Sequence, residues 1–69
     1  MTNRAPNYFN DDNGRACDVT PHSGGMLVVF GRLEMDGGLQ RLAVSHARPS
    51  RVYKTRKGAN NAVAAWLLG

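Results

Sequence analysis

The run from position 26 to position 35 begins with five apolar residues and ends with apolar and charged residues in alternation, which predicts a strand whose successive side chains lie on opposite faces. Gly31 in the middle of this run indicates a bulge or a close approach of another backbone. The step Asp36-Gly37-Gly38 follows and predicts a hairpin, so residues 39–46 form the second strand. One face of the first strand carries Leu27, Val29, Leu33 and Met35. The other face carries Val28, Phe30, Arg32 and Glu34.

Two registers of this hairpin keep its apolar faces aligned. One closes on Asp36-Gly37 and places Arg32 opposite Arg41. The other closes around Gly37-Gly38 and places Glu34 opposite Arg41. Opposite charges that face each other across a strand pair stabilise it by roughly 0.2–1 kcal/mol, and like charges destabilise it. We therefore expect the second register.

A short third strand and a C-terminal helix complete the pattern. Pro49 makes residues 47–50 a loop, and Arg51-Val52-Tyr53 is the third strand. The helix is predicted from about Arg56 to Leu68, because apolar residues recur there at helical spacing on one face. That stripe contains Ala59, Ala62, Val63, Trp66 and Leu67, with Trp66 as the expected core anchor.

Residues 1–25 show neither the two-residue period of a strand nor the 3.6-residue period of a helix. They are rich in Asn, Asp, Gly and Pro, a composition typical of flexible segments. We therefore divide the chain into a flexible, disordered N-terminal arm at 1–25 and one small domain at 26–69. The expected fold class is α+β, a β-β-β-α arrangement in which a three-stranded antiparallel sheet carries one C-terminal helix on one face.

Composition narrows the range of functions. A chain of 69 residues has a marginal core on its own. Its single cysteine, Cys17, cannot form an intrachain disulfide, and Cys17, His22 and His46 are not spaced as zinc ligands, so we expect no metal and no cofactor. The wide apolar surface of the helix, with Val28 and Phe30 on the far sheet face, predicts a homodimer. No apolar run approaches the roughly 20 residues of a membrane span, and no secretory signal is evident, so we expect a cytoplasmic protein without membrane association.

The net charge of +4 is distributed unevenly. All five acidic residues and three arginines lie within residues 1–36, which gives that segment a charge of −2. Residues 37–69 carry six cations and no acid, and five of these cations fall between positions 48 and 57. Clustered cations favour polyanions such as nucleic acid, or an acidic protein surface, and they also occur as plain solvated faces.

The cluster is densest at the predicted junction of strand and helix. Thr55 is a suitable N-cap, because its hydroxyl can accept hydrogen bonds from amides of the first turn. Arg56 and Lys57 follow in that turn, where the helix dipole favours an anion rather than a cation. We therefore predict a phosphate site. Its candidate nucleic-acid-binding residues are Arg48, Arg51, Tyr53, Lys54, Thr55, Arg56 and Lys57.

The segment from Thr55 to Ala64 resembles the start of the last helix of double-stranded-RNA-binding domains. That family places a Ser-Lys-Lys-x-Ala-Lys-x-x-Ala-Ala pattern after a three-stranded sheet, and the resemblance implies that Arg56 and Lys57 grip phosphates. The chain has Asn60 where the family has its second lysine position, and residues 1–25 predict no counterpart of the family's first helix.

The same layout is similar to the arm-binding domain of phage-type tyrosine integrases and to AP2-like modules. Those domains set a three-stranded sheet into the major groove of DNA, with a helix behind the sheet. This resemblance implies that one sheet face reads the DNA. The face would carry Arg32, Arg41, Arg51 and Tyr53.

Three classes of function follow. The principal expectation is a small non-catalytic protein that binds DNA or RNA phosphates through its basic patch. The alternative is a small protein-binding inhibitor or accessory factor, of the kind found in phages and mobile elements, that acts on host machinery. An enzyme is not expected, because the predicted fold contains no paired carboxylates and no Ser-His-Asp or Cys-His set.

Overall fold

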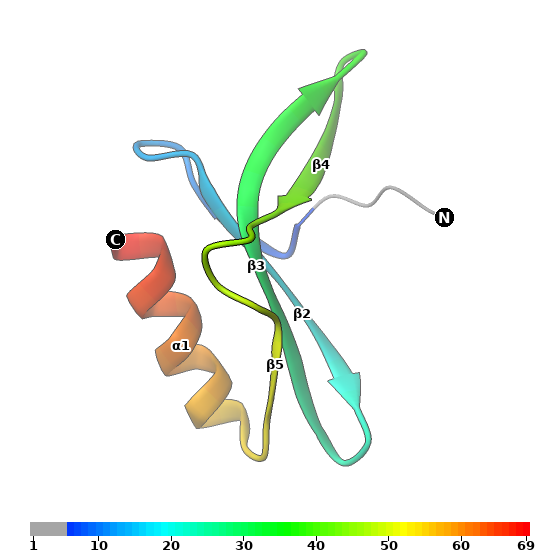
Figure 1. Cartoon of the computed structure of the whole chain (residues 1–69), viewed down its shortest axis with the longest axis vertical. Helices are drawn as coiled ribbons and strands as arrows, with labels where there is room; N and C mark the ends of the chain where they lie inside the picture. The colour runs from blue at the N-terminus through cyan, green and yellow to red at the C-terminus, as the bar shows by residue number, and fades with distance from the viewer. Residues whose placement is uncertain (1–5) are drawn as a thin grey trace.

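The computed structural model describes residues 6–69 and shows an antiparallel sheet with one helix packed on one face (Figure 1). The strands lie in the order β1-β2-β3-β4, and β5 pairs with β3. The predicted α+β class, antiparallel sheet and C-terminal helix are confirmed, but the sheet has five strands rather than three. The elements are β1 Tyr8–Asn10, β2 Arg15–His22, β3 Gly25–Asp36, β4 Leu39–Val44, β5 Arg51–Tyr53 and α1 Arg56–Leu68.

The long strand β3 organises the sheet. One of its edges pairs with β2 over residues 25–32. Two strands share its other edge: β4 pairs with residues 31–36 and β5 with residues 26–28. Both are antiparallel to β3, so they run in the same direction. Residues 45–50 connect β4 with β5 as a loop, in which Pro49 has no N–H to donate to the ladder. The pairing along this edge of β3 is therefore interrupted between β4 and β5.

Both long hairpins close through two-residue turns in the left-handed conformation. The φ angles are 45° and 80° in Ser23-Gly24, and 61° and 87° in Gly37-Gly38. Turns of this kind match the twist of the strands that they join. The second turn confirms the predicted register, in which Glu34 lies opposite Arg41.

The prediction of a flexible arm over residues 1–25 is wrong for β1 and β2, which pair with each other and with β3. Residues 1–5 lie outside the described residues. The segment is ordered because its alternate residues pack on distant partners, as Cys17 does opposite Phe30. Polar residues interrupt the apolar positions of β2, so the alternation is hard to recognise in the sequence. Strand pairing also depends on contacts across the sheet, which local composition does not contain.

The helix covers the sheet face that carries Val28, Phe30 and Cys17, and all three side chains are buried. Val28 and Phe30 were predicted to lie on the far face. That prediction is wrong, because β2 adds Cys17 to their face and makes it the apolar side against which α1 packs. Because both side chains are buried beneath α1, they offer no surface for a homodimer. The predicted helical stripe is confirmed by the buried residues of α1, which are Ala59, Ala62 and Val63.

The turn between β1 and β2 holds the C-terminal end of α1. The side-chain amides of Asn10 and Asn13 both donate to the Leu67 carbonyl, at 2.8 and 2.7 Å. Arg15 donates through Nη1 to the Trp66 carbonyl at 3.2 Å, and its guanidinium carbon lies 4.3 Å from the centroid of the Trp66 ring. These bonds satisfy carbonyls that a helix end leaves without partners. The N-terminal strands are thus an integral part of the helix packing.

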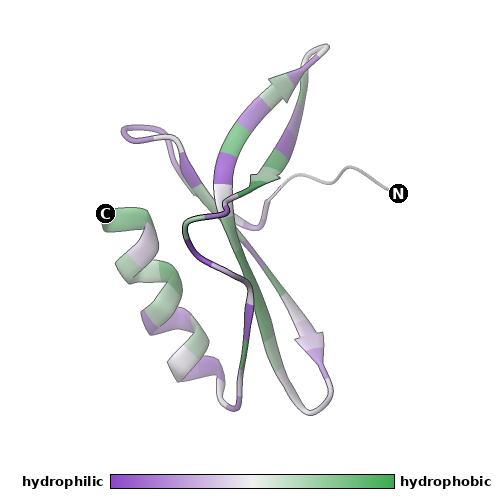
Figure 2. Cartoon of the chain, in the orientation of Figure 1, coloured by the Kyte–Doolittle hydropathy of each residue, from purple (hydrophilic) through white to green (hydrophobic). Residues whose placement is uncertain are grey.

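The sheet face opposite α1 is not covered by any other element of residues 6–69. The β3–β4 hairpin also extends beyond the helix, and hydrophobic and polar residues alternate along it (Figure 2). Several apolar side chains are exposed on this opposite face. They include Val44 at 58%, Val52 at 44% and Phe9 at 42%.

Candidate nucleic-acid interface

Five cations that follow β4 have no carboxylate partner among residues 6–69. Other arginines are engaged. Arg41 lies 3.7 Å from Glu34 and 3.8 Å from Asp36, whereas Arg15 and Arg32 donate hydrogen bonds to backbone carbonyls. The five residues without a carboxylate partner form what we call the basic strip. It consists of Arg48, Arg51, Lys54, Arg56 and Lys57.

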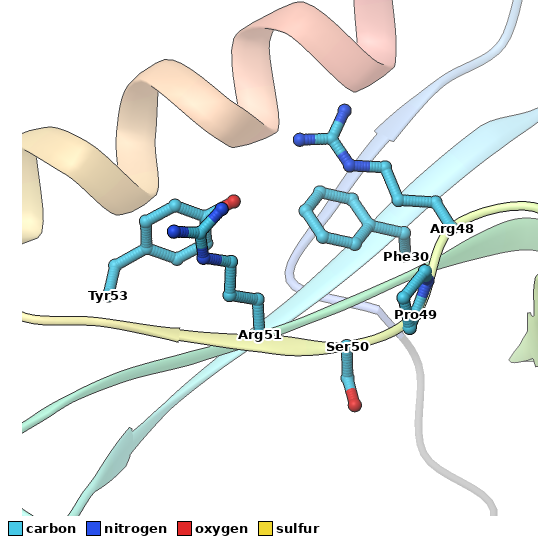
Figure 3. Close-up of a pocket in the computed structure, with 6 residues that line it drawn as sticks. All are labelled: Phe30, Arg48, Pro49, Ser50, Arg51 and Tyr53. Carbon is cyan, nitrogen blue, oxygen red and sulfur yellow. The ribbon is translucent and has the colours of Figure 1, made fainter.

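Two arginines of the strip lie over aromatic rings. The guanidinium carbon of Arg48 is 4.3 Å from the centroid of Phe30, and that of Arg51 is 5.3 Å from the centroid of Tyr53. All four side chains point toward α1, whereas Ser50 points away (Figure 3). The pocket that they line has a volume of about 280 Å³. We call it the arginine pocket.

The break in the edge of β3 creates the arginine pocket. Before the break, the Ser45 N–H donates to the Phe30 carbonyl at 2.9 Å, and pairing with β3 resumes at Arg51. Between these points residues 46–50 leave the edge, which allows Arg48 to fold back over the buried Phe30 ring. The pocket therefore depends on a backbone interruption and not on the cations alone.

The helix begins at Arg56, behind the predicted N-cap. Thr55 has extended backbone angles, φ −127° and ψ 153°, and its hydroxyl accepts from the Gly58 N–H at 3.1 Å. The Thr55 carbonyl accepts from the Ala59 N–H, also at 3.1 Å. The first turn has no acidic residue, and the side chains of Arg56 and Lys57 are exposed. The partial positive charge of the helix end and two cations therefore add together, which favours a bound anion.

The structure divides the seven predicted binding residues into two neighbouring groups. The pocket group is Arg48, Arg51 and Tyr53. The exposed group, at the β5–α1 turn, is Lys54, Thr55, Arg56 and Lys57. Sequence reasoning missed Phe30, the ring beneath Arg48. Its face could have been found only by recognising the alternation of β2, because Cys17 lies opposite it.

The helix lies on the sheet face that carries Arg51 and Tyr53. A Cβ atom added at Gly58 of α1 would lie 3.6 Å from the Tyr53 ring, which places this ring directly against the first turn of the helix. The resemblance to integrase arm-binding domains implies that this face is free and that the helix lies behind the sheet. On β5 the structure shows the reverse: α1 covers the face that carries Arg51 and Tyr53.

Cys17 lies opposite Phe30 on the neighbouring strand β2, and it is fully buried. Burial raises the pKa of its thiol to about 11, and the positive charge of Arg48 offsets only part of this rise. The thiol is therefore protonated at neutral pH. Elsewhere in the described part of the chain, no three His, Cys, Asp or Glu side chains gather as they would around a metal ion.

The raised pKa of Cys17 predicts a loss of stability in alkaline solution. The unfolded thiol ionises near its ordinary pKa of 9.0, whereas the folded thiol keeps its proton until about pH 11. The stabilising contribution is thus complete below pH 9 and is lost as the pH rises to 11. We expect the wild type to lose about 2 kcal/mol more unfolding free energy over this interval than Cys17→Ala. Urea unfolding followed by tryptophan fluorescence at both pH values measures this difference, and identical losses in the two proteins would contradict the assignment.

No family model, no curated protein and no solved structure matches this chain. Within residues 6–69, no helix is long and apolar enough to cross a membrane.

Proposed function

We propose that this protein binds nucleic acid without catalysis and holds its phosphates along the basic strip. The supporting observation is that the cations differ in whether they have a carboxylate partner. Arg41 is matched with two carboxylates, while all five cations from Arg48 to Lys57 face no carboxylate of residues 6–69. Concentrated like charge raises the energy of the free protein, and a polyanion lowers it.

The two groups of the strip have different roles in this proposal. Arg48 and Arg51 lie over rings, so their donor groups are held in place and can meet a phosphate as a planar fork. Lys54, Arg56 and Lys57 are exposed and contribute longer-range attraction beside the helix N-terminus. The strip follows the chain from the loop before β5, along β5 and into the first turn of α1, so its cations can contact several successive phosphates.

The double substitution Arg56→Ala with Lys57→Ala is expected to weaken binding and to reduce its dependence on salt. Each phosphate contact with a single strand contributes about 0.7 to the slope of log affinity against log salt, because binding releases condensed counterions. Loss of two contacts should therefore reduce the slope by about 1.4. Fluorescence anisotropy with a labelled oligonucleotide at several salt concentrations measures the slope.

The matched control is Arg32→Ala with Arg41→Ala, which removes the same net charge outside the strip. We expect this control to keep the wild-type slope, because Arg41 is already paired with carboxylates and Arg32 donates to the Asn13 carbonyl. Equal slopes for the wild type and the strip variant would overturn the proposed phosphate site. A reduced slope in the control alone would instead favour the β3–β4 hairpin as the binding surface.

Protein binding is the second candidate, and the uncovered sheet face opposite α1 favours it. Val44 and Val52 are exposed on that face, which has no covering element among the residues described. Exposed apolar faces of this kind often mark sites of association. The titration above separates the candidates, because a protein that acts only through this face would bind no oligonucleotide at low salt.

A further inference from the structure

The arginine pocket contains two cations that lie over aromatic rings and have no acceptor for their donor groups among residues 6–69. The guanidinium of Arg48 lies over the Phe30 ring and that of Arg51 over the Tyr53 ring, and both side chains line the pocket. Neither Arg48 nor Arg51 forms a hydrogen bond or an ion pair within residues 6–69. The cation–π contacts favour the observed positions of both side chains, so the two guanidinium groups lie at the pocket before a ligand arrives.

The size of the pocket limits what can enter it. Pockets that hold drug-sized ligands have volumes of about 300–1,000 Å³. A volume of about 280 Å³ lies just below that range, and it suits one small planar group rather than a stacked base pair. The pocket is lined by two planar cations and two aromatic side chains, and both kinds of group can stack on a nucleobase.

The position of α1 also disfavours entry of a duplex. Readout of a duplex groove needs a helix or a β-ribbon that protrudes into it. Arg51 and Tyr53 instead point toward α1 from the covered side of the sheet, as Figure 3 shows. A flexible single strand can thread a base into this recess while its backbone follows β5 toward Lys54 and the N-terminus of α1.

We infer that the arginine pocket receives one unstacked nucleotide of a single-stranded nucleic acid. The base stacks on the free face of a guanidinium, and the adjoining phosphate meets the donor edges of Arg48 and Arg51. This inference rests on the proposed function and makes it more specific, because it names single strands as the preferred ligand. Recognition through stacking is tolerant of base identity, so little sequence preference is expected.

The test compares three labelled ligands of equal length at one salt concentration: a single-stranded oligonucleotide, its duplex and an abasic strand of the same backbone. The wild type should bind the single strand about tenfold or more tightly than the duplex or the abasic strand, since stacking of one base on a side chain increases affinity by about that factor. The informative variant is Arg48→Lys with Arg51→Lys. It keeps both charges and removes both planar groups.

We expect the lysine variant to lose the preference for bases, so that it binds the single strand and the abasic strand equally. Its affinity for the duplex and its salt slope should stay at wild-type values. Circular dichroism and thermal unfolding verify that the variant is folded, and Arg51→Lys alone provides a milder substitution if the double variant is not.

The outcomes separate this inference from the proposed function. Equal, salt-dependent binding of all three ligands by the wild type would overturn the inference and leave phosphate binding in place. An unchanged preference in a folded lysine variant would also overturn it, because planarity would then be irrelevant. Absence of binding to every ligand at low salt would overturn the proposed function and the inference together.

Discussion

Replacing Trp66 by alanine is expected to cost about 3–5 kcal/mol of unfolding free energy. The ring packs edge-on against Phe30, with centroids 5.7 Å apart. Its Nε1–H donates to two backbone carbonyls, those of Ala16 on β2 and Gly31 on β3, at 3.1 Å each. One side chain therefore joins the helix to two strands. A chain of this length is stable by only about 3–10 kcal/mol in total, so we expect the variant to be largely unfolded.

Two further substitutions separate the contributions of the indole. Trp66→Phe keeps most of the ring packing and loses both hydrogen bonds, so it should cost less, about 1–3 kcal/mol. Leu68→Ala is the control on the same helix, because Leu68 is 82% exposed and should change stability little. Urea unfolding followed by circular dichroism compares all three variants without relying on the tryptophan signal. A midpoint for Trp66→Ala equal to that of Leu68→Ala would contradict the assigned role.

The second large effect is expected for Gly31→Ala, which should cost about 3 kcal/mol. A Cβ atom at this position would collide with the carbonyl oxygen of Ala43 and would lie 2.9 Å from its carbonyl carbon. Both atoms belong to the β4 backbone and cannot rotate away, so the strands must separate. The sequence predicted a bulge or a close backbone approach at Gly31, and the structure confirms the close approach.

Gly37→Ala is the matched control for this prediction. It adds the same methyl group at a position where no atom lies within 4 Å, so it introduces only the strain of a positive φ, 61°. We expect that strain to cost about 1–2 kcal/mol and to leave the pairing of β3 with β4 intact. Amide hydrogen exchange in β4 distinguishes the two, since only Gly31→Ala should accelerate it. Similar exchange in both variants would show that the contact with Ala43 is not limiting.

Features that depend on neighbours in the sequence could be predicted reliably. The hairpin closed by Gly37-Gly38 follows from turn chemistry and from the match of Glu34 with Arg41. The helix follows from its 3.6-residue period, its N-cap Thr55 and its apolar stripe. Each of these signals involves residues that are close along the chain, so no distant partner is needed to read them.

Features that depend on distant partners were predicted wrongly. β1 and β2 are short or interspersed with polar residues, and they are held by pairing with each other and with β3 and by bonds from Asn10 and Asn13 to the end of α1. Omission of β2 then led to the wrong face for Phe30. The choice between two nearly equal faces of a strand depends on what its neighbours add to each face, and the missing neighbour carried Cys17.

The candidate site shows the same division. The sequence alone predicts that cations without nearby acids gather between Arg48 and Lys57 and that they meet the start of a helix, because charge and helix capping are local properties. The position of Arg48 over Phe30 could not be predicted in this way, since this contact requires the chain to leave the edge of β3 and return to it. The same holds for the packing of α1 on the face of Arg51 and Tyr53. Packing between elements far apart in the sequence is set by the whole sheet, and no local pattern encodes it.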